Sequence, residues 1–136
     1  MKRRRFEELE HTADIAIRVR GTSLAELFAN AAYGMADQIT DIETVKLTTE
    51  SKVELQAADV EMLLVDWLGE LLYLGERKNV VFIEFDMQEV TPHSLAAVAR
   101  GGPIIEHHGH IKAVTFSEMD VKETEEGYET VIVFDV

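Results

Sequence analysis

The chain of 136 residues has no cysteine, only two prolines and no long hydrophobic run. The lack of cysteine excludes a disulfide scaffold, a thiolate metal site and a cysteine nucleophile. No stretch approaches the ~18 apolar residues that are typical of a membrane-spanning helix. The basic start, Met-Lys-Arg-Arg-Arg-Phe, is not followed by the apolar segment of a secretory signal. We therefore expect a cytoplasmic protein with no membrane partner.

Basic residues are also scarce, because 13 Lys and Arg stand against 26 Asp and Glu, for a formal net charge of −13. Nucleic-acid binding draws much of its affinity from cationic side chains on phosphates. A surface this acidic would repel RNA over most of its area, so we expect only indirect contact with RNA. The charge would attract cations and basic proteins, or it serves solubility alone.

Hydrophobic periodicity predicts more strands than helices within one domain, 1–136. The alternating or apolar segments that predict strands are 15–20, 44–49 and 52–57 (a hairpin or two short strands), 80–85, 94–100, 113–121 and 128–136. The last of them is apolar on both faces, which is typical of a central strand. Residues 101–103, Gly-Gly-Pro, predict a break, and 106–110 predict a polar loop.

Two helices are indicated by apolar residues at helical spacing. The first begins at Thr22 or Ser23, with Glu26 completing a capping box, and ends near Asp37. The second begins at the N-cap Asp59 and extends over three turns toward a stop at Gly75. Because the helices do not alternate regularly with parallel strands, the fold class is α+β.

Oxygen atoms that could bind a metal ion would lie close together if the first predicted strand lies beside the last. Asp14 precedes the first strand, and Asp135 and Val136 end the last one. The side-chain carboxylates of Asp14 and Asp135 and the terminal carboxylate of Val136 would then lie close together. Crowded carboxylates disfavour joint ionisation, so the cluster is either a site of charge repulsion or a site for a hard divalent cation. The alternative is a pair of ordinary strand-end aspartates.

Four motifs in order resemble those of the archease family and together cover nearly the whole chain. They are His-Thr-Ala-Asp-Ile at 11–15, Asp-x-Glu-x-Leu-Leu at 59–64 leading into Trp-Leu-x-Glu-Leu-Leu-Tyr-Leu at 67–74, Lys-Ala-Val-Thr at 112–115, and Asp-Val at 135–136. The resemblance implies a compact α+β fold, related to strand-helix-strand-strand modules, with a mixed or antiparallel sheet packed against two main helices.

The same resemblance implies a function without catalysis of its own. Archeases activate the GTP- and manganese-dependent ligase that joins RNA 3′-phosphate or cyclic phosphate ends to 5′-hydroxyl ends in tRNA splicing and RNA repair. They promote the guanylylation and multiple turnover of that ligase. The family also binds a divalent cation; calcium is expected here, with magnesium or manganese as alternatives. The ligand roles carry over to Asp14, Asp135 and Val136, so a C-terminal extension is expected to impair activity.

Three further residues are candidates for supporting or partner-binding roles, namely His11, Asp59 and Lys112. Asp59 is first an N-cap, with a second role near the cation as the alternative. Lys112 would form an ion pair with the acidic cluster or anchor a partner phosphate. The chain departs from the family at residues 116–117, where Phe-Ser replaces the usual Tyr-His. A serine hydroxyl cannot carry charge near pH 7. Ser117 could therefore not replace that histidine in a role that needs a positive charge.

Two other functions stay open, a stand-alone metal-dependent hydrolase and a chaperone-like binding module. A hydrolase would use a cation-bound water at the same carboxylates. No P-loop and no Ser-His-Asp order accompanies them. The Glu-His-His-Gly-His run at 106–110 matches no standard structural zinc spacing, so we interpret it as a polar loop.

Overall fold

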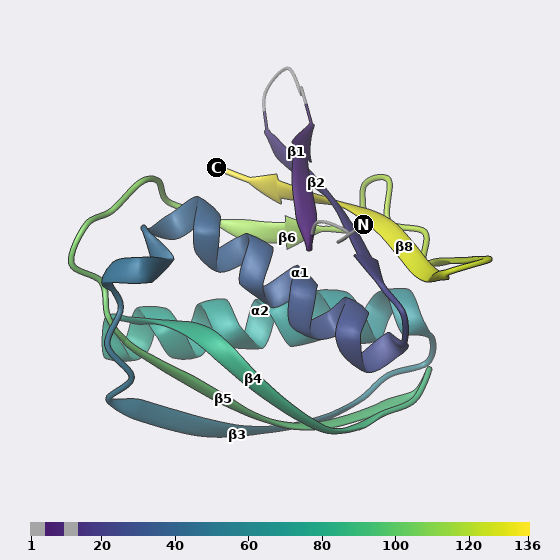
Figure 1. The fold of residues 1–136 in the computed structure, drawn as a ribbon, viewed down its shortest axis with the longest axis horizontal. Helices are drawn as coiled ribbons and strands as arrows, with labels where there is room; N and C mark the ends of the chain where they lie inside the picture. Colours follow the sequence, from purple (N-terminus) through teal and green to yellow (C-terminus); the bar gives the residue numbers. More distant parts are fainter. Residues whose placement is uncertain (1–4, 10–13) are drawn as a thin grey trace.

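The computed structural model describes residues 5–9 and 14–136. The elements in chain order are β1 (Phe6–Leu9), β2 (Ile15–Gly21), α1 (Leu24–Ile39), the 3-10 helix η1 (Ile42–Thr44), β3 (Thr49–Gln56), α2 (Val60–Lys78), β4 (Val80–Val90), β5 (Ser94–Pro103), β6 (Ala113–Thr115), β7 (Lys122–Thr124) and β8 (Gly127–Asp135) (Figure 1). None of the described helices is long and apolar enough to cross a membrane.

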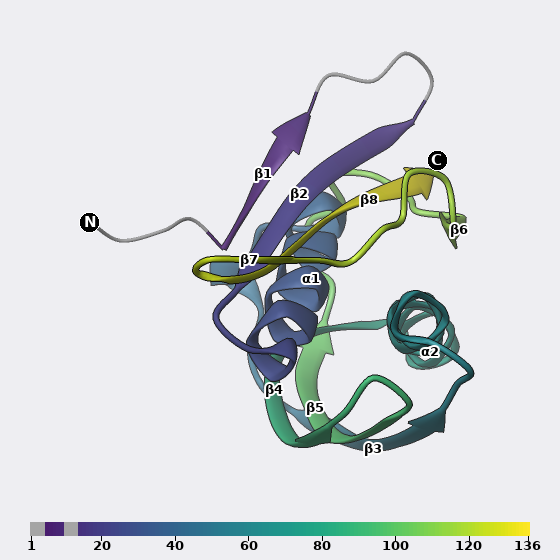
Figure 2. The same cartoon turned by 90° about the vertical axis from the view of Figure 1, so that its right-hand side faces the viewer.

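The strands form two separate antiparallel sheets, with both helices lying between them (Figures 1 and 2). One sheet has the order β1-β2-β8-β6, with β7 also paired to β8, and the other has the order β3-β5-β4. The predicted α+β class with two main helices is therefore confirmed. The prediction of β8 as a central strand is also confirmed, because β2 pairs with one edge while β6 and β7 share the other.

The core lies between the two sheets and centres on Trp67 of α2. This side chain is fully buried, and its Nε1 donates a hydrogen bond to the backbone oxygen of Phe28 at 3.0 Å. Its ring meets Phe85 of β4 edge-on, with ring centroids 5.8 Å apart and planes at 74°. A buried indole needs a partner for its N–H. One residue therefore joins α2 to α1 and to the three-stranded sheet.

The helix boundaries follow the predicted caps at their N-termini. Ser23 Oγ accepts from the Glu26 amide at 3.1 Å, while Glu26 Oε1 accepts from the Thr22 amide rather than from that of Ser23. Asp59 Oδ1 accepts from the Met62 amide at 2.8 Å, which confirms the predicted N-cap of α2.

The C-termini lie further along the chain than predicted. Helix α1 continues two residues past Asp37. Helix α2 passes Gly75 and ends at Lys78, followed by the C-cap Asn79, whose φ of 54° is left-handed. Asparagine tolerates this conformation better than most residues. Gly75 is needed for packing instead, since a Cβ there would lie 2.7 Å from the Val80 carbonyl oxygen.

Three predictions for the strands were wrong. Residues 44–57 form no hairpin, because η1 occupies 42–44 and the single strand β3 pairs with β5. Residues 101–103 continue β5 instead of breaking it; side chains at Gly101 and Gly102 would overlap the carbonyls of Val81 and Lys46. The predicted strand 113–121 is divided into β6 and a turn leading to β7, with Glu118 at a positive φ of 63°.

Strand β1 was not predicted, and cross-strand ion pairs hold it on the sheet. Glu7 lies opposite Arg18, and their charged groups approach to 2.9 Å. Arg20 contacts both Glu7 and Glu129 at 3.4 Å, across β1, β2 and β8. The hydrogen bond from Arg18 holds the pKa of Glu7 below its ordinary value, ahead of the charge of Arg20. These ion pairs join the side chains of β1, β2 and β8 on the outer face of the sheet.

We expect Trp67→Phe to lower the free energy of unfolding by about 2–4 kcal/mol, because it removes the indole hydrogen bond and leaves a cavity in the core. Urea denaturation measures the change. The control is Tyr73→Phe on the same helix, where the side chain is 54% exposed and the effect should be small. Equal stability of the two variants would contradict the central role of Trp67.

Candidate functional site

The predicted acidic pair lies at one end of the five-stranded sheet. In the antiparallel register Ile15 pairs with Phe134 and Ala16 with Val133, and Asp14 directly precedes Ile15. Continuing the register by one residue sets Asp14 opposite Asp135. On the other side of β8, Ala113 of β6 pairs with Asp135. Because directly opposite residues share a face of a sheet, Asp14, Asp135 and Ala113 form one row across three strands, which we call the strand-end row.

A backbone hydrogen bond holds Asp135 in the strand-end row, and the Asp135 side chain is exposed. The Lys112 amide donates to the Asp135 carbonyl oxygen at 2.8 Å. Asp14 is half-buried, Asp135 is exposed and Val136 is 41% exposed. Lys112, the residue before β6, is exposed as well. Asp135 thus combines a hydrogen-bonded backbone with a carboxylate that a cation or a partner could reach.

The structure does not bring all predicted residues to this place. His11 lies outside the described residues. Asp59 lies toward the opposite end of β8. Glu61, the second residue of α2, accepts from the Val121 amide at 2.9 Å, and β7, which follows Val121, pairs with the first residues of β8. Asp135 ends that same strand. Asp59 therefore caps its helix away from the strand-end row.

The strand-end row could hold a hard cation only if other groups complete the coordination of the ion. Within residues 5–9 and 14–136, no group of three or more His, Cys, Asp or Glu residues is placed to hold a metal ion. The row supplies two carboxylate side chains, whereas Ca²⁺ takes 6–8 oxygens. The missing ligands would come from Val136 oxygens, water or a partner. The roles of Asp14, Asp135 and Val136 as ligands remain predictions.

Residues 116–117, where the chain departs from the family pattern, form an exposed turn just after β6. Phe116 is 55% exposed, and its carbonyl accepts from the Met119 amide at 3.0 Å. The Ser117 amide donates to Thr115 Oγ1 at 3.1 Å. Thr115 pairs with Val133, two residues before Asp135 on the central strand. The register therefore carries this turn away from Asp135 along β8, and the turn presents an aromatic ring to solvent.

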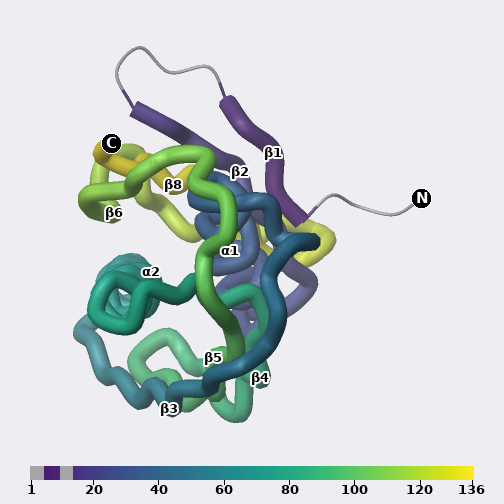
Figure 3. The backbone as a smooth tube through the Cα atoms, turned by 90° about the vertical axis from the view of Figure 1, so that its left-hand side faces the viewer, coloured from purple at the N-terminus to yellow at the C-terminus, as the bar shows by residue number. Residues whose placement is uncertain are grey.

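A cavity that sequence reasoning missed lies beneath the connection from β5 to β6. Figure 3 shows this connection crossing the end of the molecule in front of the helices. The cavity has a volume of about 250 Å³, and its lining comes from α1, α2, β4 and residues 104–111. From the sequence, residues 106–110 are predicted only to form a polar loop. No local pattern could reveal a cavity built from four separate segments.

Comparison with known proteins identifies the family. The model of the Archease protein family (MTH1598/TM1083) matches residues 6–136. The chain is 40% identical to the "Protein archease" of Methanosarcina mazei, covering 98% of this chain and 97% of that protein. The relative from Saccharolobus islandicus is 38% identical over 98% and 99% of the two chains. The chain belongs to the archease family.

Solved structures agree with this assignment. The solution structure of Methanobacterium thermoautotrophicum protein 1598 has a TM-score of 0.79 and 30% identity, covering 97% of this chain and 99% of that one. The crystal structure of a Thermotoga maritima protein, described as "an archease, possible chaperone", has a TM-score of 0.68 over the whole chain and 98% of that protein. At 23% identity, the second likeness shows the archease fold alone.

An acidic residue near the end of α1 has an unfavourable charge that a mutation can remove. Burial raises the pKa of Asp37 above its ordinary value, and the neighbouring charge of Glu8 raises it further. Asp37 also lies in the last turn of α1, where the helix dipole disfavours a negative charge. The ionised form of Asp37 therefore opposes folding at neutral pH.

We expect Asp37→Asn to raise the thermal unfolding midpoint slightly at pH 7. A raised carboxyl pKa in the folded state means that this unfavourable contribution grows as the pH rises from the unfolded to the folded value. The gain should fade below about pH 4, where the unfolded carboxyl is protonated as well. Scanning calorimetry at both pH values tests this, with Glu43→Gln as an exposed control. A gain that does not change with pH would refute the explanation.

Proposed function

We propose that this protein is a non-enzymatic activator of a GTP- and manganese-dependent RNA ligase, acting in tRNA splicing and RNA repair. Membership of the archease family over residues 6–136 carries this proposal. On this proposal the protein promotes guanylylation of the ligase and its multiple turnover. An activator leaves the equilibrium of ligation unchanged, so it lowers a barrier or releases a trapped state of the ligase.

The strand-end row supports a role at the contact with the ligase. Asp14 and Asp135 would hold a divalent cation, expected to be calcium, together with oxygens of Val136. Once bound, the cation would offset the repulsion between the two carboxylates and order them. Ligand positions not filled by this chain would remain for water or for oxygens of the ligase. The exposure of Asp135 and Val136 suits such a shared site.

The net charge of −13 supports docking on a basic surface of the ligase. Complementary charge mainly raises the association rate and fixes orientation. It would also keep free RNA away from the activator, so that RNA contact stays indirect. Activation should therefore weaken as ionic strength screens the exposed charges. A chaperone-like module, by contrast, would protect unrelated proteins with less dependence on salt.

We expect the native protein to accelerate guanylylation and multiple-turnover ligation by the ligase of its own organism, and Asp14→Asn or Asp135→Asn to remove most of the acceleration. The control is Asp86→Asn, which makes the same change of charge at an exposed position on β4 of the other sheet and should leave activation near normal. Circular dichroism establishes that all variants fold. Equal activation by the Asp135→Asn variant and the control would contradict a role for the strand-end row.

Cation binding can be measured without the ligase. We expect titration calorimetry with calcium to show one saturable site in the native chain, and at least about tenfold weaker binding after Asp135→Asn, equivalent to ~1.4 kcal/mol. Asp86→Asn should bind as the native protein does. Unchanged affinity in Asp135→Asn would contradict the ligand role of that carboxylate. Manganese and magnesium titrations decide which cation the site prefers.

A stand-alone hydrolase is the other function to test at the same carboxylates. Phosphatase or nuclease activity of the isolated protein, lost in Asp14→Asn, would replace the activator proposal. Protection of unrelated proteins from aggregation, unchanged in both aspartate variants, would instead favour the chaperone-like module.

A further inference from the structure

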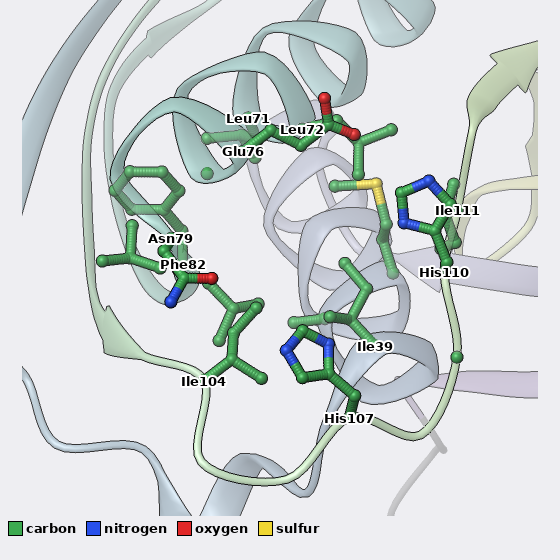
Figure 4. A pocket seen from close by; sticks show the side chains of 16 residues that line it. Ile39, Leu71, Leu72, Glu76, Asn79, Phe82, Ile104, His107, His110 and Ile111 are labelled. Carbon is green, nitrogen blue, oxygen red and sulfur yellow. The ribbon is translucent and has the colours of Figure 1, made fainter.

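The cavity beneath residues 104–111 has a buried apolar floor and a polar rim (Figure 4). The floor is formed mainly by aliphatic and aromatic side chains of α1, α2 and β4, together with Ile111, and the buried members include Met35, Leu71, Val80 and Phe82. Exposed polar side chains stand at the rim, namely Glu76, Asn79, His107 and His110. This distribution is typical of small-molecule sites, where apolar walls surround a few polar groups.

The connection that covers the cavity is held in place by hydrogen bonds to the end of α1. Thr40 Oγ1 donates to the Glu106 carbonyl oxygen at 2.5 Å, and the His108 amide donates to the Ile39 carbonyl oxygen at 2.8 Å. Thr40 and His107 also form an isolated antiparallel bridge. Thr40 is fully buried. The covering segment, residues 104–111, is therefore joined to the end of α1 by several hydrogen bonds. The cavity beneath this segment is part of the fold.

The volume sets the size of the occupant. An apolar cavity of roughly 150 Å³ is sufficient for benzene. The present cavity of about 250 Å³ would hold a body of one or two fused rings with a short substituent reaching the rim.

The charges that line the cavity determine which charge the substituent of the ligand should carry. Helices α1 and α2 both end at this cavity, and the carbonyl end of a helix carries partial negative charge. Glu76 adds a carboxylate, and none of the lining residues is a lysine or arginine. Apart from the two rim histidines, no lining side chain would balance an anionic ligand, and the helix ends would repel it; a cationic group would instead meet Glu76.

We propose that this cavity binds a small amphipathic amine, with its flat apolar body on the buried floor and its ammonium group at Glu76. The lining shares no residue with the strand-end row, so the site is separate from the proposed activator function. The ligand would contact the last turn of α2 and the connection into β6 together. Its binding would therefore tie the wall segment more firmly to the helices.

Three probes with the same ring test the proposed selectivity: tryptamine as the cation, indole as the neutral body and indole-3-propionate as the anion. We expect nuclear magnetic resonance titrations of the full chain to shift the amides of Ile39 and Ile111 saturably. Tryptamine should bind about threefold to fivefold more tightly than indole, the range of a partly exposed ion pair, and the propionate most weakly. Absence of saturable shifts with all three probes would overturn the proposal.

Glu76→Gln should bring the affinity for tryptamine down to that for indole while leaving indole binding unchanged. Glu70→Gln is the matched control on the same helix, because Glu70 does not line the cavity, and it should retain the preference for tryptamine. If the preference survives in Glu76→Gln, or is lost equally in the control, the assignment of the ammonium group to Glu76 is wrong.

A pair of neighbouring substitutions tests the location. Ile104 lines the cavity, whereas the adjacent Ile105 is 68% exposed and does not. Ile104→Trp should fill the space and abolish binding of indole and tryptamine, while Ile105→Trp should bind both normally. Thermal unfolding establishes that each variant is folded. Normal binding by a folded Ile104→Trp variant would overturn the placement of the ligand in this cavity.

Discussion

The buried contact of Trp67 with Phe28 is the interaction on which the arrangement of layers depends. It joins the two helices, and the same indole packs edge-on against Phe85 of the three-stranded sheet. Each helix must present apolar residues to more than one neighbour, because both lie between two sheets. A single apolar stripe would suffice for a helix with one solvent-exposed face. Here both sheets close over the helix pair and form one continuous core.

The central position of β8 follows from this packing and creates the strand-end row. Ile132 and Phe134 are fully buried toward the core, while β2 and β6 complete the hydrogen bonding of the last residues on both edges. The backbone at Asp135 is held on the β6 side, by its pairing with Ala113 and the hydrogen bond from the Lys112 amide, although its side chain is exposed. A site on the end of a packed strand keeps its geometry better than a site on a loop. This rigidity suits the proposed contact with a ligase.

Electrostatics separates the surface into regions with different roles. On the five-stranded sheet, Arg18 and Arg20 form ion pairs across the strands with Glu7 and Glu129. The pairs with Glu7 stabilise the edge strand β1. The remaining excess of acidic residues gives the chain its net charge of −13. In this setting a cation at Asp14 and Asp135, or an ammonium group at Glu76, would enter a favourable field. The acidic composition is thus consistent with both proposed sites.

The sequence by itself determined the features that depend on neighbouring residues. The caps at Ser23 and Asp59, the two helices and the apolar central strand are encoded in local spacing, and the family motifs indicated the α+β fold. Tertiary structure decided what depends on distant partners. Strand β3 pairs with residues about forty positions later, so no hairpin signal could reveal it, and Gly101 and Gly102 serve close backbone approach instead of a break. The cavity exists only where two helix ends, a strand and a remote connection meet, because no short segment encloses a volume alone.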